Sequence, residues 1–329
     1  MKKILFRITS VFLIIATILL SLEFLLRCFT PLKSSYPVEA FEYDPVCKWS
    51  FKKGLNIFLS KDYQQEIHTN RIGSVNFQES FDGYRDSVFV LGDSFTQGSG
   101  LPADANYPFQ LDLMLNLNNK RYTKDYAVVN LGQCGIGTRQ AICILKKYSS
   151  CLRTPRFILY QGDESDYEDD VMYTKLAMAL PFSGNPQVPC LIQWLVRHTE
   201  TAATCFKFYI EHFRRKIASQ IKNSDRAALQ ELVLDELKQT ADALNAKLIV
   251  TWAEPDPEGS YRWLQSWAMK NGVAFADWRP EVKSTEQAIP DIPFGNHHSA
   301  GHYRTWVNYV IAKSFFEKIQ QFKQFELNK

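Results

Sequence analysis

The sequence predicts an α/β protein whose parallel sheet is covered by helices on both faces. Five short apolar runs, at 88–91, 127–131, 157–160, 248–252 and 273–276, have the length and composition of buried strands. Helical segments or one long insertion separate these runs, and strands that alternate with helices form parallel sheets. The chain has 329 residues, 46% of them hydrophobic, which is enough to bury the core of one such domain.

The N-terminus combines a basic start with a long apolar run. Basic residues at 2, 3 and 7 precede an apolar stretch from 8 to 22, which continues to 26 after Glu23 and is about long enough to cross a bilayer. Residues 23–28 offer no small-residue cleavage site. We therefore expect 1–28 to be an uncleaved signal anchor, with the rest of the chain outside the cytoplasm by the positive-inside rule. For Glu23, at the outer end, we expect a structural role.

Composition divides the remainder into a lead-in, a main domain and a short tail. Residues 29–86 are rich in aromatic and polar residues without clear periodicity, and we expect them to wrap the domain. The main domain covers 87–323 with helices expected at 107–117, 139–148, 227–244 and 304–322, and 324–329 form a tail. An insertion at about 164–222 starts with acidic residues, which either shape a substrate site or form a solvated loop before a packing helix.

Charge and cysteine usage exclude several classes of partner. The net charge of +3 comes without a basic stripe, so we do not expect nucleic acid to bind. The seven cysteines lack Cys-x-x-Cys spacing, which argues against a zinc cage and a redox pair. An oxidising compartment permits a disulfide, and we expect Cys190 to pair with Cys205. The odd count leaves at least one free thiol or an intermolecular partner.

Ser94 is the strongest candidate for a reactive group. The apolar strand at 88–91 runs straight into a small-residue turn, bracketed by Gly92 and Gly98, and a helix-like segment follows. A turn of this kind lifts one hydroxyl clear of the sheet edge, as a nucleophile requires. The alternative is that Ser94 caps the following helix through its side-chain oxygen.

Other candidates follow later strands, because ligands of open α/β sheets bind beyond the carboxyl ends of the strands. A glycine-rich turn that contains Gly135 follows the second strand, and Asp163 follows the third. Three of the six histidines lie just before the last helix, at His297, His298 and His302, a clustering that favours acid–base chemistry over the lesser alternative of metal ligation. No nucleotide-binding fingerprint is present, and we expect no cofactor.

These four blocks resemble the SGNH, or GDSL, family of hydrolases and acyltransferases over about 85–320. The resemblance implies a flavodoxin-like, three-layer α/β/α fold with a mainly parallel five-stranded sheet. It also implies Ser94 as nucleophile and the amides of Ser94 and Gly135 as donors to the oxyanion. By its distance from the last helix, His297 matches the general base of the family, with His298 as the alternative base.

The chain departs from the family pattern at Asp163, where the family has an oxyanion-hole asparagine. Loss of one such donor costs about 3 to 4 kcal/mol, and an ionised carboxylate about 4 Å from the oxyanion adds up to about 4 kcal/mol of repulsion. The site survives if Asp163 is protonated by burial, if its side chain turns away, or if Gln133 or Gln161 donates instead.

A second departure is the aspartate that the family places two or three residues before its histidine. Phe294 and Gly295 occupy those positions before His297 and cannot orient an imidazole. The nearest upstream carboxylate is Asp291, which could complete a triad. An unsupported Ser-His dyad is the other possibility.

The sequence therefore predicts a serine esterase or O-acyltransferase of SGNH type, anchored by one helix in a bacterial inner membrane with its domain in the periplasm. The expected substrates are small acyl esters, above all acetyl esters, of cell-envelope glycans. The alternative is a catalytically impaired SGNH-like domain that binds a polysaccharide or an envelope assembly partner. The sequence does not define the oligomeric state.

Overall fold

The centre of the molecule is a five-stranded sheet in which every neighbouring pair of strands is parallel. The computed structural model describes residues 2–29, 40–60, 64–118, 121–176, 185–220, 223–254, 259–295 and 302–327. The sheet has the order β11–β10–β9–β5–β8. Its strands are β5 (Asp86–Gly92), β8 (Tyr126–Asn130), β9 (Phe157–Gly162), β10 (Lys247–Trp252) and β11 (Ala274–Phe275). In chain order this is the 2-1-3-4-5 arrangement of flavodoxin-like folds, which confirms the predicted fold class.

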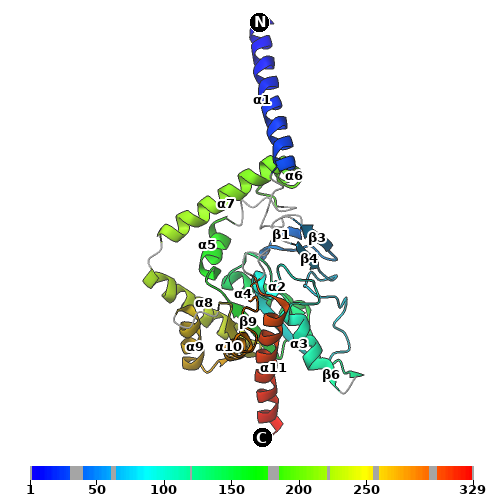
Figure 1. Cartoon of the computed structure of the whole chain (residues 1–329), viewed down its shortest axis with the longest axis vertical. Helices are drawn as coiled ribbons and strands as arrows, with labels where there is room; N and C mark the ends of the chain where they lie inside the picture. The colour runs from blue at the N-terminus through cyan, green and yellow to red at the C-terminus, as the bar shows by residue number, and fades with distance from the viewer. Residues whose placement is uncertain are drawn as a thin grey trace.

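Alternate residues of each strand point to opposite faces of the sheet. Apolar residues point to both faces, and helices cover both. Phe89 and Leu91 of β5 pack in one core together with residues of α4 (Thr138–Cys151), α8 (Asn223–Ala243) and α9 (Ser260–Lys270). Val88 and Val90 pack in the other, with α3 (Tyr107–Asn116), α10 (Arg279–Ala288) and α11 (Thr305–Leu327). Figure 1 shows α11 running from the middle of the domain to the C-terminal end of the molecule.

The lead-in is more regular than the sequence predicts. It contains two antiparallel hairpins, β1 (Phe41–Asp44) with β2 (Lys48–Phe51) and β3 (Asn56–Ser60) with β4 (Gln64–His68). A two-stranded ribbon, β6 (Leu117–Asn118) with β7 (Arg121–Tyr122), follows α3. In the first hairpin Phe41 and Phe51 are opposite each other on the two strands, and their rings stack with the centroids 4.6 Å apart. This side-chain contact stabilises a hairpin whose sequence lacks a clear alternating pattern.

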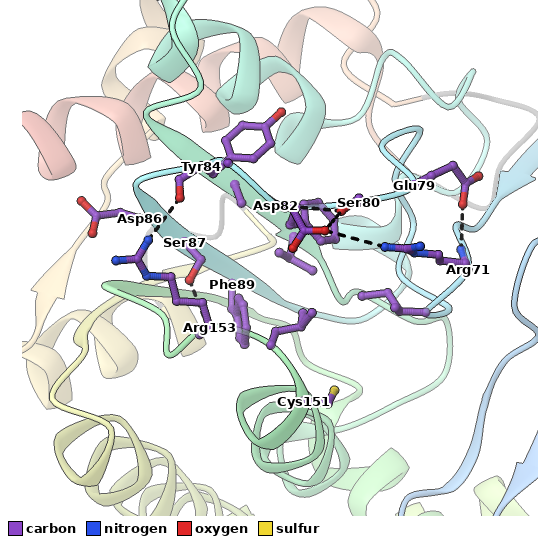
Figure 2. Close-up of a pocket in the computed structure, with 16 residues that line it drawn as sticks. Arg71, Glu79, Ser80, Asp82, Tyr84, Asp86, Ser87, Phe89, Cys151 and Arg153 are labelled. Atoms are coloured by element: carbon purple, nitrogen blue, oxygen red, sulfur yellow. Dashed lines mark hydrogen bonds and ion pairs between the residues drawn. The ribbon is translucent and has the colours of Figure 1, made fainter.

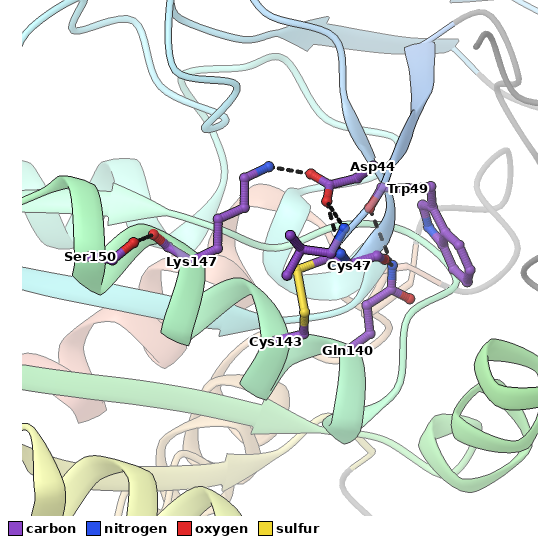
Figure 3. Close-up of a disulfide and its surroundings, with 8 residues drawn as sticks. Asp44, Cys47, Trp49, Gln140, Cys143, Lys147 and Ser150 are labelled. Atoms are coloured by element: carbon purple, nitrogen blue, oxygen red, sulfur yellow. Dashed lines mark hydrogen bonds and ion pairs between the residues drawn. A yellow bond between two sulfur atoms is a disulfide. The ribbon is translucent and has the colours of Figure 1, made fainter. Parts of the chain in front are cut away.

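A disulfide between Cys47 and Cys143 joins the first hairpin to α4 (Figure 3). The two Cα atoms are 5.7 Å apart, although 96 residues separate the cysteines in sequence. The expected pairing of Cys190 with Cys205 is wrong, because both thiols are free and exposed. Partners this distant in sequence are brought together only by the fold, which is why spacing gave no signal for Cys47 and Cys143.

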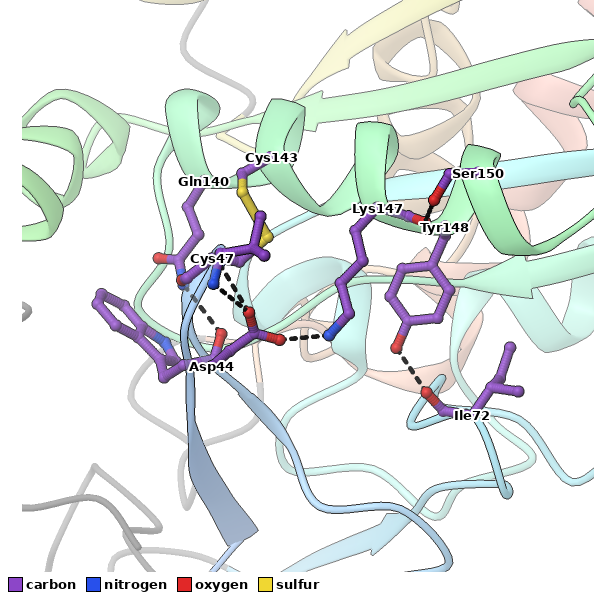
Figure 4. Close-up of polar contacts among 10 residues, drawn as sticks. Asp44, Cys47, Ile72, Gln140, Cys143, Lys147, Tyr148 and Ser150 are labelled. Carbon is purple, nitrogen blue, oxygen red and sulfur yellow. Dashed lines mark hydrogen bonds and ion pairs between the residues drawn. A yellow bond between two sulfur atoms is a disulfide. The ribbon is translucent and has the colours of Figure 1, made fainter. Parts of the chain in front are cut away.

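Polar contacts around the disulfide hold the hairpin against α4. Asp44 accepts hydrogen bonds from the amides of Val46 and Cys47, each 2.8 Å long, and pairs with Lys147 of α4 (Figure 4). Burial opposes ionisation of Asp44. The hydrogen bond from Lys147 and those from the two amides together outweigh burial, so the pKa of the carboxyl is lowered. Gln140 Nε2 donates to the carbonyl oxygen of Cys47 over 3.0 Å. The lead-in is therefore bound to the domain.

The N-terminal helix α1 (Lys2–Phe29) extends away from the domain (Figure 1). Its stretch Phe6–Leu26 is apolar and long enough to cross a membrane. Glu23 accepts hydrogen bonds of 2.9 Å from both the amide and the hydroxyl of Thr201, in the first turn of α7 (Glu200–Gln220). The insertion thus contacts the end of the apolar helix.

The remaining helices of the insertion are α5 (Asp166–Leu176) and α6 (Cys190–His198). Three acidic side chains of α5, those of Asp166, Asp169 and Asp170, are buried. The acidic start of the insertion is therefore a buried helix and not a solvated loop.

The disulfide predicts a stability difference. Because the bridge closes a loop with a sequence separation of 96, Cys143→Ala is expected to lower the free energy of unfolding by about 2 to 4 kcal/mol. Urea unfolding of the full chain in detergent micelles, followed by tryptophan fluorescence, measures this. Cys190→Ala, which removes an exposed free thiol, is the matched control and is expected to change nothing. Equal stability of the two variants would contradict a structural role for the bridge.

Candidate active site

A glycine at the end of β5 sets the turn that displays Ser94. Gly92 has φ +151°, and a Cβ at this position would lie 2.2 Å from Thr96 Oγ1 and 2.7 Å from the carbonyl oxygen of Gln161. Asp93 then caps α2 (Ser94–Gln97) by accepting a 2.9 Å hydrogen bond from the amide of Phe95. The capping residue is thus Asp93, and Ser94 is left at the first helical position with its side chain partly exposed.

The Ser94 hydroxyl meets a histidine from the other end of the chain. Ser94 Oγ lies 2.7 Å from His302 Nε2 and 3.2 Å from Asp93 Oδ2. The imidazole is held by its neighbours, since its centroid is 4.7 Å from that of the Phe95 ring. With its proton on Nδ1, His302 accepts the serine proton at Nε2, as a general base must.

The histidine that reaches Ser94 is not the one expected from the family spacing. His297 and His298, the expected base and its alternative, lie outside the described residues. His302 comes three positions before the start of α11 at Thr305. This short distance was the available signal, because a residue next to a helix that is anchored in the core has a fixed position.

The loop that contains Gly135 is hydrogen-bonded to the turn that carries Ser94. The amide of Gln133 donates to the carbonyl oxygen of Gly92 over 3.1 Å, and the amide of Cys134 donates to Gln97 Oε1 over 2.9 Å. Gly135 follows with φ +70°, a conformation that favours glycine. The loop then leads into α4, and the amides of Gln133 and Cys134 hold it against the turn that carries Ser94.

Asp163 is buried, and its charge and that of Asp93, the residue before Ser94, act on each other. Asp163 Oδ1 accepts hydrogen bonds from the amides of Ser165 and Asp166, of 2.7 and 3.0 Å, and so caps the start of α5. We call Asp93 and Asp163 the acidic pair.

Burial favours the protonated form of both carboxyls. Burial, followed by the charges of Asp93 and Asp169, raises the pKa of Asp163 well above its usual range. Burial likewise raises the pKa of Asp93 to about 7, although the hydrogen bond from the Phe95 amide opposes the rise. Around neutral pH the pair therefore carries less than its full negative charge, which reduces its repulsion of an oxyanion.

Further buried carboxyl groups surround the pair. Burial raises the pKa of Asp166 well above its usual range and that of Asp170 to about 8. Each has a structural partner, because Tyr160 donates its hydroxyl proton to Asp166 and the amide of Arg139 donates to Asp170 over 2.7 Å. In the part of the chain that the structure describes, no group of three or more His, Cys, Asp or Glu side chains is arranged to hold a metal ion.

Glu254 is a carboxyl group at the same edge that sequence reasoning missed. Burial and the charge of Asp163 raise its pKa to about 8. It follows β10, the fourth strand of the sheet in chain order, by two positions. This place directly after a strand was the available signal.

The remaining predicted site residues are not brought to Ser94 by any described contact. Asp291 is exposed with φ +63°. Gln161 accepts a hydrogen bond from Thr96 Oγ1 over 3.3 Å, and its side chain is thus engaged beneath the turn. Gln133 is also buried, and its Oε1 has no hydrogen-bond partner among the described residues.

A separate hollow of about 580 Å³ lies at the opposite edge of the sheet (Figure 2). Its lining includes Asp86 and Ser87 at the start of β5, whereas Ser94 follows the end of that strand. Arg153 donates from Nη1 to the carbonyl oxygen of Tyr84 over 3.1 Å and thereby closes one side. A substrate in this hollow would be a strand's length away from Ser94.

Solved structures similar to this chain include proteins titled as G-D-S-L family members and esterases. A lipolytic protein of the G-D-S-L family from Veillonella parvula is 13% identical, with 70% of this chain and 96% of that chain covered and a TM-score of 0.41. A catalytic mutant of Axe2, an acetylxylan esterase from Geobacillus stearothermophilus, is 12% identical, with 73% and 96% covered and a TM-score of 0.41. The psychrotrophic esterase EstA from Pseudoalteromonas sp. is 10% identical, with 73% and 99% covered and a TM-score of 0.39.

No family model and no curated protein sequence matches the chain. At such low identities and scores, the structural likeness says nothing about which reaction this chain catalyses.

The buried carboxyl groups predict that the protein is more stable at pH 5 than at pH 8. A carboxyl whose folded-state pKa is raised stabilises the fold fully below its unfolded-state pKa, and the contribution is lost as the pH rises through the folded-state value. Asp93 alone, with its pKa raised to about 7, accounts for a loss of roughly 3 kcal/mol over this window.

Urea unfolding of the full chain in micelles at pH 5 and pH 8 tests this. Asp163→Asn, which removes one raised carboxyl, is expected to reduce the difference. Asp82→Asn, at an exposed carboxyl that lines the hollow at the other edge of the sheet, is expected to leave it unchanged. A protein that is equally or more stable at pH 8 would contradict the protonated state of these groups.

Proposed function

We propose that this chain is a serine esterase or O-acyltransferase of SGNH type, with Ser94 as nucleophile and His302 as general base. The observation that carries the proposal is the distance of 2.7 Å between Ser94 Oγ and His302 Nε2. A hydroxyl at a strained strand-to-helix turn, in contact with an imidazole, is the arrangement that activates serine for attack on an ester carbonyl.

In the proposed reaction each group has one role. Ser94 Oγ attacks the acyl carbon and its proton moves to His302 Nε2, while negative charge develops on the carbonyl oxygen. The amides of Ser94 and Gly135 bind that oxygen. His302 then protonates the leaving alcohol as the tetrahedral intermediate collapses to an acyl-enzyme. Attack by water completes hydrolysis, and attack by a sugar hydroxyl completes acyl transfer.

The proposed substrates are small acyl esters, above all acetyl esters, of glycans in a bacterial cell envelope. The disulfide between Cys47 and Cys143 supports an oxidising compartment for the domain, and the basic start of α1 supports a cytoplasmic N-terminus. We therefore place α1 in the inner membrane and the domain in the periplasm. In Figure 1 α2 lies in the half of the domain nearer α1, so Ser94 would act close to the membrane.

The second candidate function is a catalytically impaired SGNH-like domain that binds a polysaccharide or an envelope assembly partner. Two observations favour it. Asp163 stands where the family has an asparagine donor, and the positions two and three residues before His302 are Ala300 and Ser299, which carry no carboxylate. Asp291 remains the proposed third member if the site is a triad.

A fluorophosphonate probe separates the two candidates and identifies the base. Full-length chain in micelles is expected to label covalently and to hydrolyse p-nitrophenyl acetate. Ser94→Ala is expected to abolish both, and His302→Ala to reduce kcat/KM by about 100-fold or more, because it removes the general base. His297→Ala is the matched variant and is expected to keep most activity. Absence of labelling would support the binding domain, and selective loss in His297→Ala would make that residue the base.

Asp163→Asn is expected to preserve or raise esterase activity, most of all at alkaline pH. The asparagine keeps an oxygen for the amides of Ser165 and Asp166 and offers Asp93 a hydrogen-bond donor that does not titrate. In the native chain, rising pH ionises these two carboxyls, whose pKa values are raised, and adds negative charge beside Ser94. The ratio of kcat/KM for the variant to that of the native chain should therefore rise from pH 6 to pH 9.

The same profile measured for Asp82→Asn should give a ratio independent of pH, since this exposed carboxyl lies at the other edge of the sheet. A large loss of activity in Asp163→Asn at every pH would mean that the carboxylate itself is required.

A further inference from the structure

The outer side of helix α6 (Cys190–His198) is apolar, which is the reverse of an ordinary surface helix. Leu191, Ile192 and Trp194 are exposed to 66%, 47% and 54%. The polar Gln193 is buried instead, and its Nε2 donates to the carbonyl oxygens of Asn185 and Val188 over 2.7 and 2.8 Å. The helix therefore satisfies its polar side chain within the protein and presents apolar side chains outward.

The position of α6 is fixed relative to the apolar helix α1. Val196 of α6 and Ile210 of α7 are buried in the same core, and the two helices pack against each other. The first turn of α7 is in turn bound to Glu23 of α1 through Thr201. Glu23 lies near the end of the apolar stretch Phe6–Leu26, and Figure 1 shows α6 beside that end of α1.

We propose that α6 is a membrane-docking helix, with Leu191, Ile192 and Trp194 inserted in the interface of the bilayer that α1 crosses. The apolar surface of α1 and the outer side of α6 are neighbours, so a bilayer around α1 also reaches α6. Tryptophan prefers the boundary between headgroups and acyl chains, because its ring is apolar and its N–H is polar. Helices that lie in this boundary bind through their buried apolar area.

The next helix, α7, also has exposed aromatic side chains. Phe208 and Tyr209 of α7 are exposed to 66% and 50%. Large apolar side chains gathered on neighbouring helices at one end of a domain mark an interaction surface rather than scattered exposure. A bilayer is the occupant that adjoins this end through α1. The proposal does not depend on Ser94 being a nucleophile, because it rests on α1, α6 and α7 alone.

Quenching of tryptophan fluorescence by brominated lipid tests the docking. Six of the seven tryptophans lie outside the insertion and none lies in α1. The full chain is reconstituted in vesicles of phosphatidylcholine, or of phosphatidylcholine brominated near the top of its acyl chains. The native chain is expected to lose emission in the brominated vesicles, and Trp194→Phe to lose at least half of that difference. Trp263→Phe, in α9, is the matched control and should keep the full difference.

A second variant tests the surface without removing the reporter. Leu191→Glu with Ile192→Glu changes two exposed side chains, keeps α1 as an anchor, and is expected to reduce quenching of Trp194 and shift its emission to longer wavelength. Equal quenching of the native chain and Trp194→Phe would overturn the proposal. A second result would also overturn it: brominated lipid does not quench Trp194, and the double variant has half the molecular mass of the native protein in micelles. A second copy of the chain would then cover this surface.

Discussion

The contact between Ser94 Oγ and His302 Nε2 depends on two separate parts of the fold meeting at one edge of the sheet. Ser94 is placed by the turn after β5, whose Gly92 permits a backbone conformation that any side chain would block. His302 is placed by α11, which packs in the core against α3. Neither element holds the contact alone, so a change that moves α11 relative to β5 would separate nucleophile and base while leaving both residues intact.

The electrostatics of this edge are set by buried acids rather than by a donor asparagine. Burial raises the pKa of both Asp93 and Asp163 and so favours their protonated forms. The carboxyl of Asp163 also caps α5, and Asp170 of α5 accepts a hydrogen bond from α4. The acidic start of the insertion thus builds the rim of the site. Protonation of these carboxyls both permits their burial and reduces their repulsion of an oxyanion. Through these groups, activity and stability are therefore both expected to fall as the pH rises.

The sheet, its flanking helices and Ser94 could be predicted from sequence because local apolar runs and turn glycines determine them. The residue pairings could not. His297 was predicted as the base instead of His302, because family spacing counts residues along the chain. The contact with Ser94 Oγ depends instead on distance in space. Cys47 and Cys143 are 96 residues apart, and only the docking of the lead-in on α4 brings them together. The apolar outer side of α6 was likewise invisible, because the sequence does not say which side of an amphipathic helix faces the protein.

The most direct measurement of the central claim is a crystal structure of the chain after reaction with a p-nitrophenyl phosphonate ester. We expect phosphorus bonded to Ser94 Oγ with p-nitrophenolate released, a phosphonyl oxygen about 2.7 to 3.1 Å from the amides of Ser94 and Gly135, and His302 Nε2 facing the substituents that remain on phosphorus. An adduct on another residue would contradict it. So would an adduct on Ser94 with His302 turned away and another group in contact with the leaving position.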